Sequence, residues 1–290
     1  MLKKCNLYPI IVLLCCSAIY SAEAKQFLPD PPQLDAKAWI LIDADTGYGN
    51  ALNVQRTFLG AHALPPDSGM DADQYIDFVC NEMMPYIAQH QLADAVDVFC
   101  ETVGFTLAQT ERVFMAARAN NLPVKGHVEQ LSDSKGAVLA AKYGAWSVDH
   151  IEYLDAADVP ALNRAGTVAV LLPGAFYYLR ETQLPPIEAL REHNVPVAIS
   201  TDMNPGTSPM ASLLTCANMA CVLFRLTPDE ELRGITVNAA KALRLPDKGV
   251  IKEGVDADLT LWHIASPDEL VYEINGYRPA GKWVGGRHVV

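Results

Sequence analysis

The chain alternates between short apolar runs and longer stretches with helical periodicity. In the longer stretches apolar residues recur three and four positions apart, the spacing of one face of an α-helix. Strands that alternate with helices pair in parallel, and strands that are apolar throughout are buried on both faces. The pattern therefore predicts an α/β domain with a parallel sheet covered by helices. The predicted strands lie at 39–49, 57–64, 95–101, 123–127, 146–154, 167–174 and 195–202.

The predicted helices fill the intervals between these strands and continue beyond the last one. The final helical stretch opens with Thr227 and Pro228, where threonine can cap the helix and proline takes its first position. Residues 246–290 differ, because they are glycine-punctuated and alternate between apolar and polar, which favours a few antiparallel strands outside the main domain. The predicted helices include 70–91, 106–121, 134–145, 156–166, 210–226 and 227–244.

The N-terminus has the pattern of a secretory signal. It carries two lysines at positions 3 and 4, continues with an apolar stretch too short for a comfortable membrane span, and ends with small residues before Lys25. We interpret residues 1–24 as a signal peptide, with a buried strand or helix at the start of a domain as the alternative. Residues 25–38 contain three prolines and are interpreted as a linker. The main domain is then expected at 39–245.

Charge and cysteine usage narrow the function classes. Acidic residues outnumber basic ones 34 to 22, and no run of lysine or arginine could track phosphates, which argues against a nucleic-acid partner. No second apolar stretch is long enough to span a bilayer. A soluble protein that handles a small-molecule substrate fits better. The cysteines outside the leader form no CxxC pair and look like packed thiols: Cys80, Cys100, Cys216 and Cys221. This usage favours the cytoplasm over the periplasmic or secreted location that the signal implies.

Polar groups recur at the ends of the predicted strands. The carboxyl ends of parallel strands form one concave face, so we expect three histidines and a carboxylate to converge there. Imidazole and carboxylate are ligands that zinc or iron accepts, and such a metal makes hydroxide available near neutral pH. A lone histidine is more often structural, so the argument depends on the repetition. The residues are His62, then His127 with Glu129 and Gln130, then Asp149 and His150, and finally Asp202.

Two turns add candidate binding groups. Asn204 offers a side-chain amide, and the backbone N–H groups of Gly206 and Thr207 could bind a substrate carboxylate. Tyr48 lies between two glycines after the first predicted strand. Either turn can also be a tight connection without a ligand.

Several segments, in this order, resemble the imidazolonepropionases of the amidohydrolase superfamily, which act in histidine degradation. The resemblance runs from about Trp39 to the C-terminus. It implies a metal-dependent (β/α) barrel with a small β-sandwich, and hydrolysis of 4-imidazolone-5-propanoate to N-formimidoyl-L-glutamate. The segments include GAHALPP, VKGHVEQLS, SVDHIEYL, STDMNPGTSP and GVIKEGVDADLTLW.

The resemblance also implies residue roles. His127 and Asp202 match metal-binding positions for one divalent ion, zinc or iron, and His150 matches the histidine that helps to activate water. Asp202 or His150 would move the proton to the leaving nitrogen. The positions that match substrate contacts are Tyr48, His62, Gln130, Asn204, Gly206 and Thr207.

The chain departs from the family at its first strand, which in the family ends in an H-x-H pair that supplies two further metal ligands. This chain contains no H-x-H. We therefore expect a TIM-like barrel of the amidohydrolase type whose first strand is missing or replaced by residues 9–16, followed by a remnant of the sandwich at 246–290. Unpaired sheet edges would favour a homodimer. The alternative function is a catalytically degenerate, exported domain that binds a small ligand, or an inactive fragment.

Overall fold

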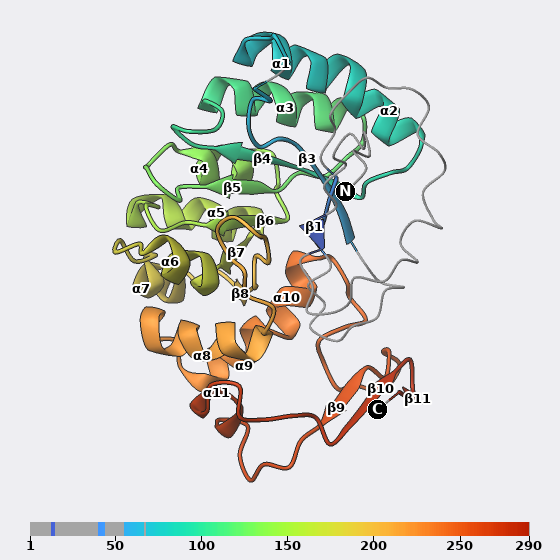
Figure 1. The fold of residues 1–290 in the computed structure, drawn as a ribbon, viewed down its shortest axis with the longest axis vertical. Coiled ribbons are helices and arrows are strands. Elements are labelled where there is room, and N and C mark those ends of the chain that lie inside the picture. Colours follow the sequence, from blue (N-terminus) through green and yellow to red (C-terminus); the bar gives the residue numbers. More distant parts are fainter. Residues whose placement is uncertain (1–12, 15–39, 44–54, 67, 290) are drawn as a thin grey trace, which may run out of the picture.

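The computed structural model describes residues 13–14, 40–43, 55–66 and 68–289. Its centre is a sheet in which six consecutive strands pair in parallel, and Figure 1 shows their helices along one side. The predicted α/β architecture is therefore confirmed. These six strands are β3 (Gln55–Ala61), β4 (Ala95–Cys100), β5 (Gly126–Val128), β6 (Ser147–His150), β7 (Val168–Leu171) and β8 (Val197–Ile199).

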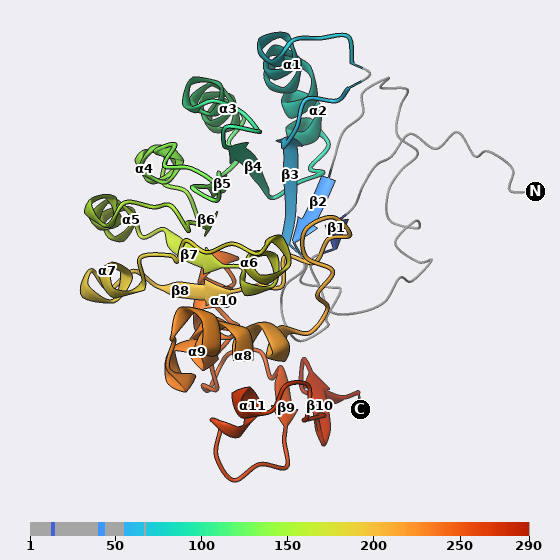
Figure 2. The ribbon, with the colours of Figure 1, turned by 60° about the vertical axis from the view of Figure 1, so that its left-hand side comes forward.

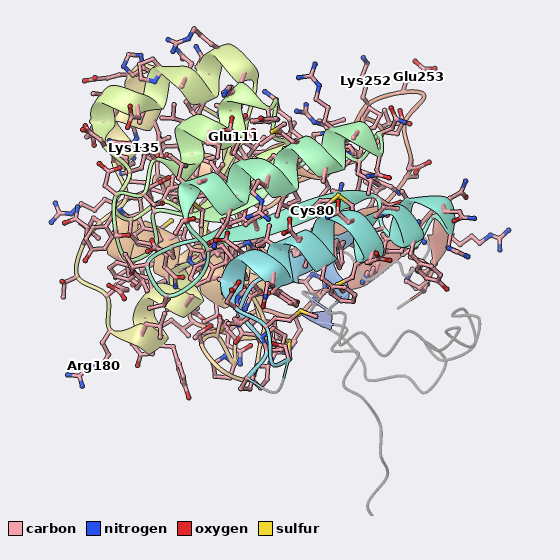
Figure 3. The ribbon with its side chains drawn as sticks, turned by 90° about the horizontal axis from the view of Figure 1, so that it is seen from above. Cys80, Glu111, Lys135, Arg180, Lys252 and Glu253 are labelled. Atoms are coloured by element: carbon pink, nitrogen blue, oxygen red, sulfur yellow. The ribbon has the colours of Figure 1, made fainter. Side chains whose placement is uncertain are left out.

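The helices that follow these strands form the outer layer of a fan around the curved sheet (Figure 2). Neighbouring helices are joined across this layer. Glu111, labelled in Figure 3, lies on α3 and accepts a hydrogen bond of 2.7 Å from Lys142 Nζ of α4. The layer consists of α1 (Ala72–Phe78), a π-helical turn (Val79–Met83), α2 (Met84–Gln89), α3 (Leu107–Ala119), α4 (Gly136–Lys142), α5 (Val159–Ala165), α6 (Pro173–Leu179), α7 (Ile187–Glu192), α8 (Leu213–Phe224) and α9 (Pro228–Gly234). The last helix of the domain, α10 (Val237–Ala242), lies outside this layer.

Alternation along each strand separates two faces of the sheet. The residues that point to the helices belong to the main apolar core, for example Val96, Val98 and Cys100 of β4. The opposite face, here called the inner face, carries polar side chains on β4 to β6 and small apolar ones on β7 and β8. Because successive side chains point to opposite faces, a charged residue inside an apolar strand can lie on the inner face. The inner-face residues include Asp97, Phe99, His127, Ser147, Asp149, Val168, Val170 and Ala198.

The first two strands correct the expectation of a wholly parallel sheet. The predicted strand at 39–49 contains β2 (Ile40–Asp43), which pairs antiparallel with β3. Eleven residues separate β2 from β3, fewer than the dozen or more that a parallel crossover needs. β1 (Leu13–Leu14) lies in the segment expected to replace the family's first strand, and it pairs parallel with β2. No pairing between β1 and β8 occurs among the described residues, so the described sheet is open.

A second correction concerns α6. The apolar run predicted as a strand at 167–174 ends earlier, at Leu171, and Pro173 begins a helix. Proline takes the first helical position without losing a needed N–H donor. The cap predicted at Thr227 is present, since Thr227 and Glu230 form a reciprocal capping box at the start of α9. The predicted stretch at 227–244 is divided into α9 and α10.

The C-terminal strands are antiparallel, as predicted. β10 (Gly281–Val284) pairs with both β9 (Leu259–Leu261) and β11 (Arg287–His288), and a short helix, α11 (Glu269–Tyr272), lies between β9 and β10 in the chain. Lys248 forms an ion pair of 2.7 Å with Asp256 before this sheet. The proposed boundary at residue 246 stays a prediction.

Helix α10 covers the amino-terminal side of the inner face. Ala242 of α10 belongs to the same apolar cluster as Val168 and Ala198. Gln55 Nε2, at the start of β3, donates to the carbonyl of Leu243 at 3.0 Å, and Asn238 Nδ2 donates to Val197 O of β8 at 2.8 Å. The carboxyl ends of the strands remain as the face at which polar groups meet.

Several expectations fall outside the described residues. They are the leader at 1–24 apart from Leu13 and Leu14, the linker at 25–38, and Tyr48. Within the described part of the chain, no helix combines the length and the apolar character that crossing a bilayer requires.

Glu231 in α9 predicts a stability that falls with rising pH. It is 2% exposed, and burial raises its pKa from 4.5 to about 8. Below pH 4.5 the Glu231 carboxyl is protonated in both the folded and the unfolded protein. Between pH 4.5 and about 8 it ionises in the unfolded protein only, so the free energy of unfolding decreases as the pH rises through this range. Glu231→Gln should remove this slope and stabilise the protein at pH 8 by roughly 2–5 kcal/mol, measured by urea unfolding at pH 5 and 8.

The neighbouring Glu230 serves as a control, because its pKa is shifted in the opposite direction to that of Glu231. Arg191 donates to both of its oxygens, at 2.6 and 2.8 Å, and these bonds lower the pKa of Glu230 to about 2. The stability contributed by this pair is therefore present above pH 4.5 and lost as pH falls towards 2. Glu230→Gln should destabilise the protein at neutral pH. Equal pH profiles for wild type and Glu231→Gln would contradict the assignment.

Candidate active site

Four of the predicted residues lie at the carboxyl ends of the parallel strands. His62 follows β3, His127 lies in β5, His150 ends β6, and Asp202 lies three residues beyond β8. The rings of His127 and His150 are 5.5 Å apart between centroids. The charge of Asp202 acts on His127, and the charge of His62 acts on His150. The structure thus brings the three histidines and the aspartate to one face.

His127 is the centre of a buried charge cluster. Its Nδ1 lies 3.0 Å from Asp97 Oδ2 and 4.0 Å from Asp149 Oδ2. Burial opposes a charge on the ring, but the nearby carboxylates, Asp97 foremost, outweigh it and raise the pKa of His127 to about 10. Burial would raise the pKa of Asp97, yet His127 and then Lys125 lower it. In the absence of a bound cation this is a buried ion pair.

The other two histidines are held neutral. Burial, followed by the charge of His127, lowers the pKa of His150 well below 6.5. Partial desolvation of the ring, followed by the charge of His127, lowers the pKa of His62 to about 4, although His62 as a residue is exposed to solvent. The ring of His62 stacks on Phe99, with centroids 5.2 Å apart and planes 18° apart. A neutral imidazole has one nitrogen that can accept a proton. His150 therefore has the protonation state that a general base requires.

The backbone is strained where these side chains are presented. His150 and Ile151 have φ of 77° and 64°, and Asp202 has φ of 47°. The left-handed region is costly for residues other than glycine, and most of all for a β-branched residue such as Ile151. Such strain persists where the surrounding structure holds it, and it clusters at functional sites.

The Asn204 turn is closed by its own side chain. Asn204 Oδ1 accepts hydrogen bonds from Gly206 N at 2.9 Å and from Thr207 N at 2.7 Å, and Asn204 Nδ2 donates to Asp202 O at 2.8 Å. The two N–H groups predicted to bind a carboxylate thus converge on one point, which an amide oxygen occupies here. A substrate carboxylate at that point would have to displace it.

The two polar residues that follow His127 differ in role. Glu129 is fully buried and turns away from the inner face, because its oxygens accept from Gly136 N at 2.6 Å and Ala137 N at 2.9 Å at the start of α4. Burial raises the pKa of Glu129 to about 7. Gln130 is also buried, just beyond the end of β5.

Two buried carboxylates at this site were missed in the sequence. Asp97 was hidden inside an apolar run, although a charge within a doubly buried strand is itself a signal. Glu152 follows the strained Ile151 and is 1% exposed, and its Oε2 has no hydrogen-bond partner among the described residues. Burial raises the pKa of Glu152 to about 8. Asp149 lies at its strand end, as the sequence pattern predicts, and contacts His127 Nδ1 at 4.0 Å.

The donor set suits a divalent cation. Ligand atoms of Asp97, His127 and Asp149 lie within 4.8 Å of one another, and all three residues are buried. Imidazole nitrogen and carboxylate oxygen are the donors that zinc and iron accept in proteins. Buried acidic groups at this density need a compensating positive charge, whether a proton on His127 or a metal ion.

Known proteins resemble this chain in sequence. The imidazolonepropionase of Alteromonas mediterranea is 66% identical over 238 residues, which are 82% of this chain and 57% of that protein. The imidazolonepropionase of Pseudoalteromonas atlantica is 56% identical over 236 residues, 81% of this chain and 58% of that protein. The chain therefore spans less than two thirds of the length of these relatives.

Solved structures resemble it in fold. A 5-methylcytosine deaminase from Klebsiella pneumoniae matches with a TM-score of 0.63 at 15% identity, covering 81% of this chain and 62% of that one. An adenosine deaminase from Xanthomonas campestris with bound zinc matches with a TM-score of 0.60 at 20% identity, covering 81% and 60%. The model of the amidohydrolase family matches residues 99–289, more than half of the chain. These residues hold β5, β6 and β8 with the side chains just described, and the chain belongs to the amidohydrolase family.

Proposed function

We propose that this chain carries the catalytic face of an imidazolonepropionase, which hydrolyses 4-imidazolone-5-propanoate to N-formimidoyl-L-glutamate. The observation that carries the proposal is the convergence of His127, His150 and Asp202 at the carboxyl ends of parallel strands. The 66% identity to a protein named imidazolonepropionase supports this substrate. The fold by itself would allow many other substrates.

The proposed cofactor is one divalent ion, zinc or iron, held by His127 and Asp202. His127 belongs to the buried donor cluster of Asp97, His127 and Asp149, which fits such an ion in kind, whereas Asp202 lies outside that cluster and is proposed because it matches a metal-binding position of the family. A protein-bound ion of this class makes hydroxide available near neutral pH. The chain has no H-x-H pair to supply the two further ligands that the family uses.

The remaining roles follow from the protonation states and contacts. His150, neutral and buried, can take a proton from water and deliver it to the leaving ring nitrogen, and Asp202 is the second candidate for that transfer. His62 and Gln130, together with Tyr48, are proposed substrate contacts. The Asn204 turn with Gly206 and Thr207 is the proposed site for the propionate.

The decisive experiment measures hydrolysis and metal content on the same purified protein. We expect the ultraviolet absorbance of 4-imidazolone-5-propanoate to decay in the presence of protein supplied with zinc or iron, and a chelator to stop the decay. A folded, metal-loaded protein without hydrolysis would exclude the activity. Thermal stabilisation by the substrate analogue imidazole-4-propionate without any metal would instead favour the alternative, a catalytically degenerate ligand-binding domain, which the missing H-x-H pair suggests.

Asn204 should govern substrate affinity. Asn204→Ala is expected to raise KM about 10-fold or more with kcat nearly unchanged, because without Asn204 Oδ1 the turn no longer holds Gly206 N and Thr207 N at one point for the propionate. A hydrogen bond to a charged group contributes about 1.5–3 kcal/mol to binding. Asn204→Asp should raise KM further, because its carboxylate repels the propionate. Steady-state kinetics check both variants. An Asp variant that binds substrate better than the Ala variant would place the propionate elsewhere.

Location and assembly stay predictions. The family favours the cytoplasm, whereas the interpretation of residues 1–24 as a signal peptide favours export. N-terminal sequencing of the protein from cells distinguishes the two, because export predicts cleavage after Ala24. The homodimer expected from open sheet edges is tested by light scattering on the purified protein.

A further inference from the structure

We propose that Asp97 is a positioning residue for His127. Its carboxylate keeps a proton on Nδ1 of the ring, so that Nε2 is the nitrogen left for a metal ion. The role in metal binding rests on the proposed function. Which ring nitrogen of His127 carries the proton can be measured without any metal. Nothing in the sequence pattern of metal ligands points to Asp97, which lies within an apolar strand.

The geometry places Asp97 against one particular ring nitrogen. β4 and β5 are parallel neighbours, with Phe99 in register with His127. From its position two residues before Phe99, Asp97 brings Oδ2 to 3.0 Å from His127 Nδ1, and the side chain is 1% exposed. Neither atom has a hydrogen-bond partner of good geometry within the described residues, so this ion-pair contact is the closest polar contact described for either of them.

The second oxygen of Asp97 is fixed by the backbone. Val98 N donates to Asp97 Oδ1 at 2.7 Å, so the carboxylate cannot rotate freely. On the same side of the ring lies Asp149, whose Oδ2 is 4.0 Å from Nδ1 and whose Oδ1 accepts from Ser147 Oγ at 3.2 Å. An ionised carboxylate can only accept hydrogen bonds. Nδ1 must therefore carry the proton, whether the ring is neutral or charged.

This arrangement has a consequence for metal binding. A histidine that donates one ring N–H to a carboxylate presents the other nitrogen as the ligand, in a fixed orientation and with higher basicity. Loss of such a carboxylate typically reduces metal affinity 10- to 100-fold. Asp97 would thus act through His127 without touching the metal itself.

The variant Asp97→Asn tests the inference because the Val98 bond sets the orientation of the new side chain. The amide oxygen keeps the Oδ1 position to accept from Val98 N, so the NH₂ group replaces Oδ2 and can only donate. Nδ1 of His127 must then become an acceptor, and the proton moves to Nε2. Glu101→Gln is the matched control, since Glu101 is a buried carboxylate just beyond the same strand that accepts from Leu131 N and Ser132 N.

The primary readout is ¹H–¹⁵N NMR of the metal-free protein, with the His127 signals identified by their loss in His127→Gln. We expect a protonated Nδ1 in wild type and Glu101→Gln, and an unprotonated Nδ1 in Asp97→Asn. Thermal unfolding establishes that each variant is folded. An unprotonated Nδ1 in wild type, or one still protonated in Asp97→Asn, would overturn the proposal.

The second readout is a Co²⁺ titration followed by ligand-field absorption. Asp97→Asn should bind Co²⁺ about 10- to 100-fold more weakly than wild type, and Glu101→Gln should bind like wild type. A loss of the same size in Glu101→Gln would overturn the role of Asp97 in metal binding. No Co²⁺ binding by wild type would contradict the proposed function, and the NMR result would still decide whether Asp97 positions the ring.

Discussion

Replacing His150 by glutamine is expected to lower kcat/KM for 4-imidazolone-5-propanoate by about 10²- to 10⁴-fold, the usual contribution of a general acid or base. Glutamine keeps a polar group of similar length but cannot take up or release a proton near neutral pH. His150 is the residue at which burial and the charge of His127 hold an imidazole neutral beside the cluster. Steady-state kinetics at saturating metal measure the effect.

The control is His263→Gln, since His263 is exposed in the C-terminal region far from the parallel strand ends in sequence and lies outside the cluster. It should leave kcat/KM unchanged. Metal content and thermal unfolding must be similar in both variants for the comparison to hold. If His150→Gln retained more than about a tenth of the activity, the proton transfer would belong to another group, and Asp202 would be the next to test.

The parallel part of the fold could be predicted because its strands are buried on both faces. Runs such as 95–101 and 195–202 are apolar nearly throughout, and each is followed by a stretch with helical spacing. The structure places β4 and β8 within them. The cap at Thr227 is equally local, because it depends on a hydrogen bond between residues three apart.

Two features of the fold could not be read from periodicity. The direction of β2 depends on the length of its connection to β3, not on the apolar pattern within the strand. At Leu171 the apolar run continues into α6, and a short apolar run does not distinguish strand from helix. The sequence signals for these two features are the eleven-residue connection between β2 and β3 and the position of Pro173.

The candidate site was partly predictable for the same reason that the sheet was. Residues at the ends of parallel strands must meet at one face, which brought His127 and His150 together. Partners within the site were not predictable. Asp97 contacts His127 because two strands happen to be neighbours in register, and Asn204 closes its own turn because its side chain reaches two N–H groups.

Glu129 shows how adjacency in sequence can mislead. It lies two residues from His127, and as a polar residue at a strand end it was grouped with the site. Its φ of 49° turns it towards the start of α4. The N-cap residue of this helix, Lys135, makes no capping hydrogen bond with its side chain. There the carboxylate accepts from Gly136 N, Ala137 N and Ser134 Oγ at 2.6, 2.9 and 3.0 Å. Glu129 therefore caps the N-terminus of α4, although it lies seven residues before the first residue of that helix.

Glu129→Ala should consequently reduce stability by about 3 kcal/mol, because two buried N–H groups lose their acceptor and each costs about 1–3 kcal/mol unpaired. Urea unfolding measures this loss. Ser134→Ala removes one hydroxyl, which can donate either to this carboxylate or to Cys100 O, each at 3.0 Å, and it should cost only about 1 kcal/mol. Equal stability of Glu129→Ala and wild type would show that α4 does not depend on this acceptor, whereas activity lost without stability would return Glu129 to the catalytic site.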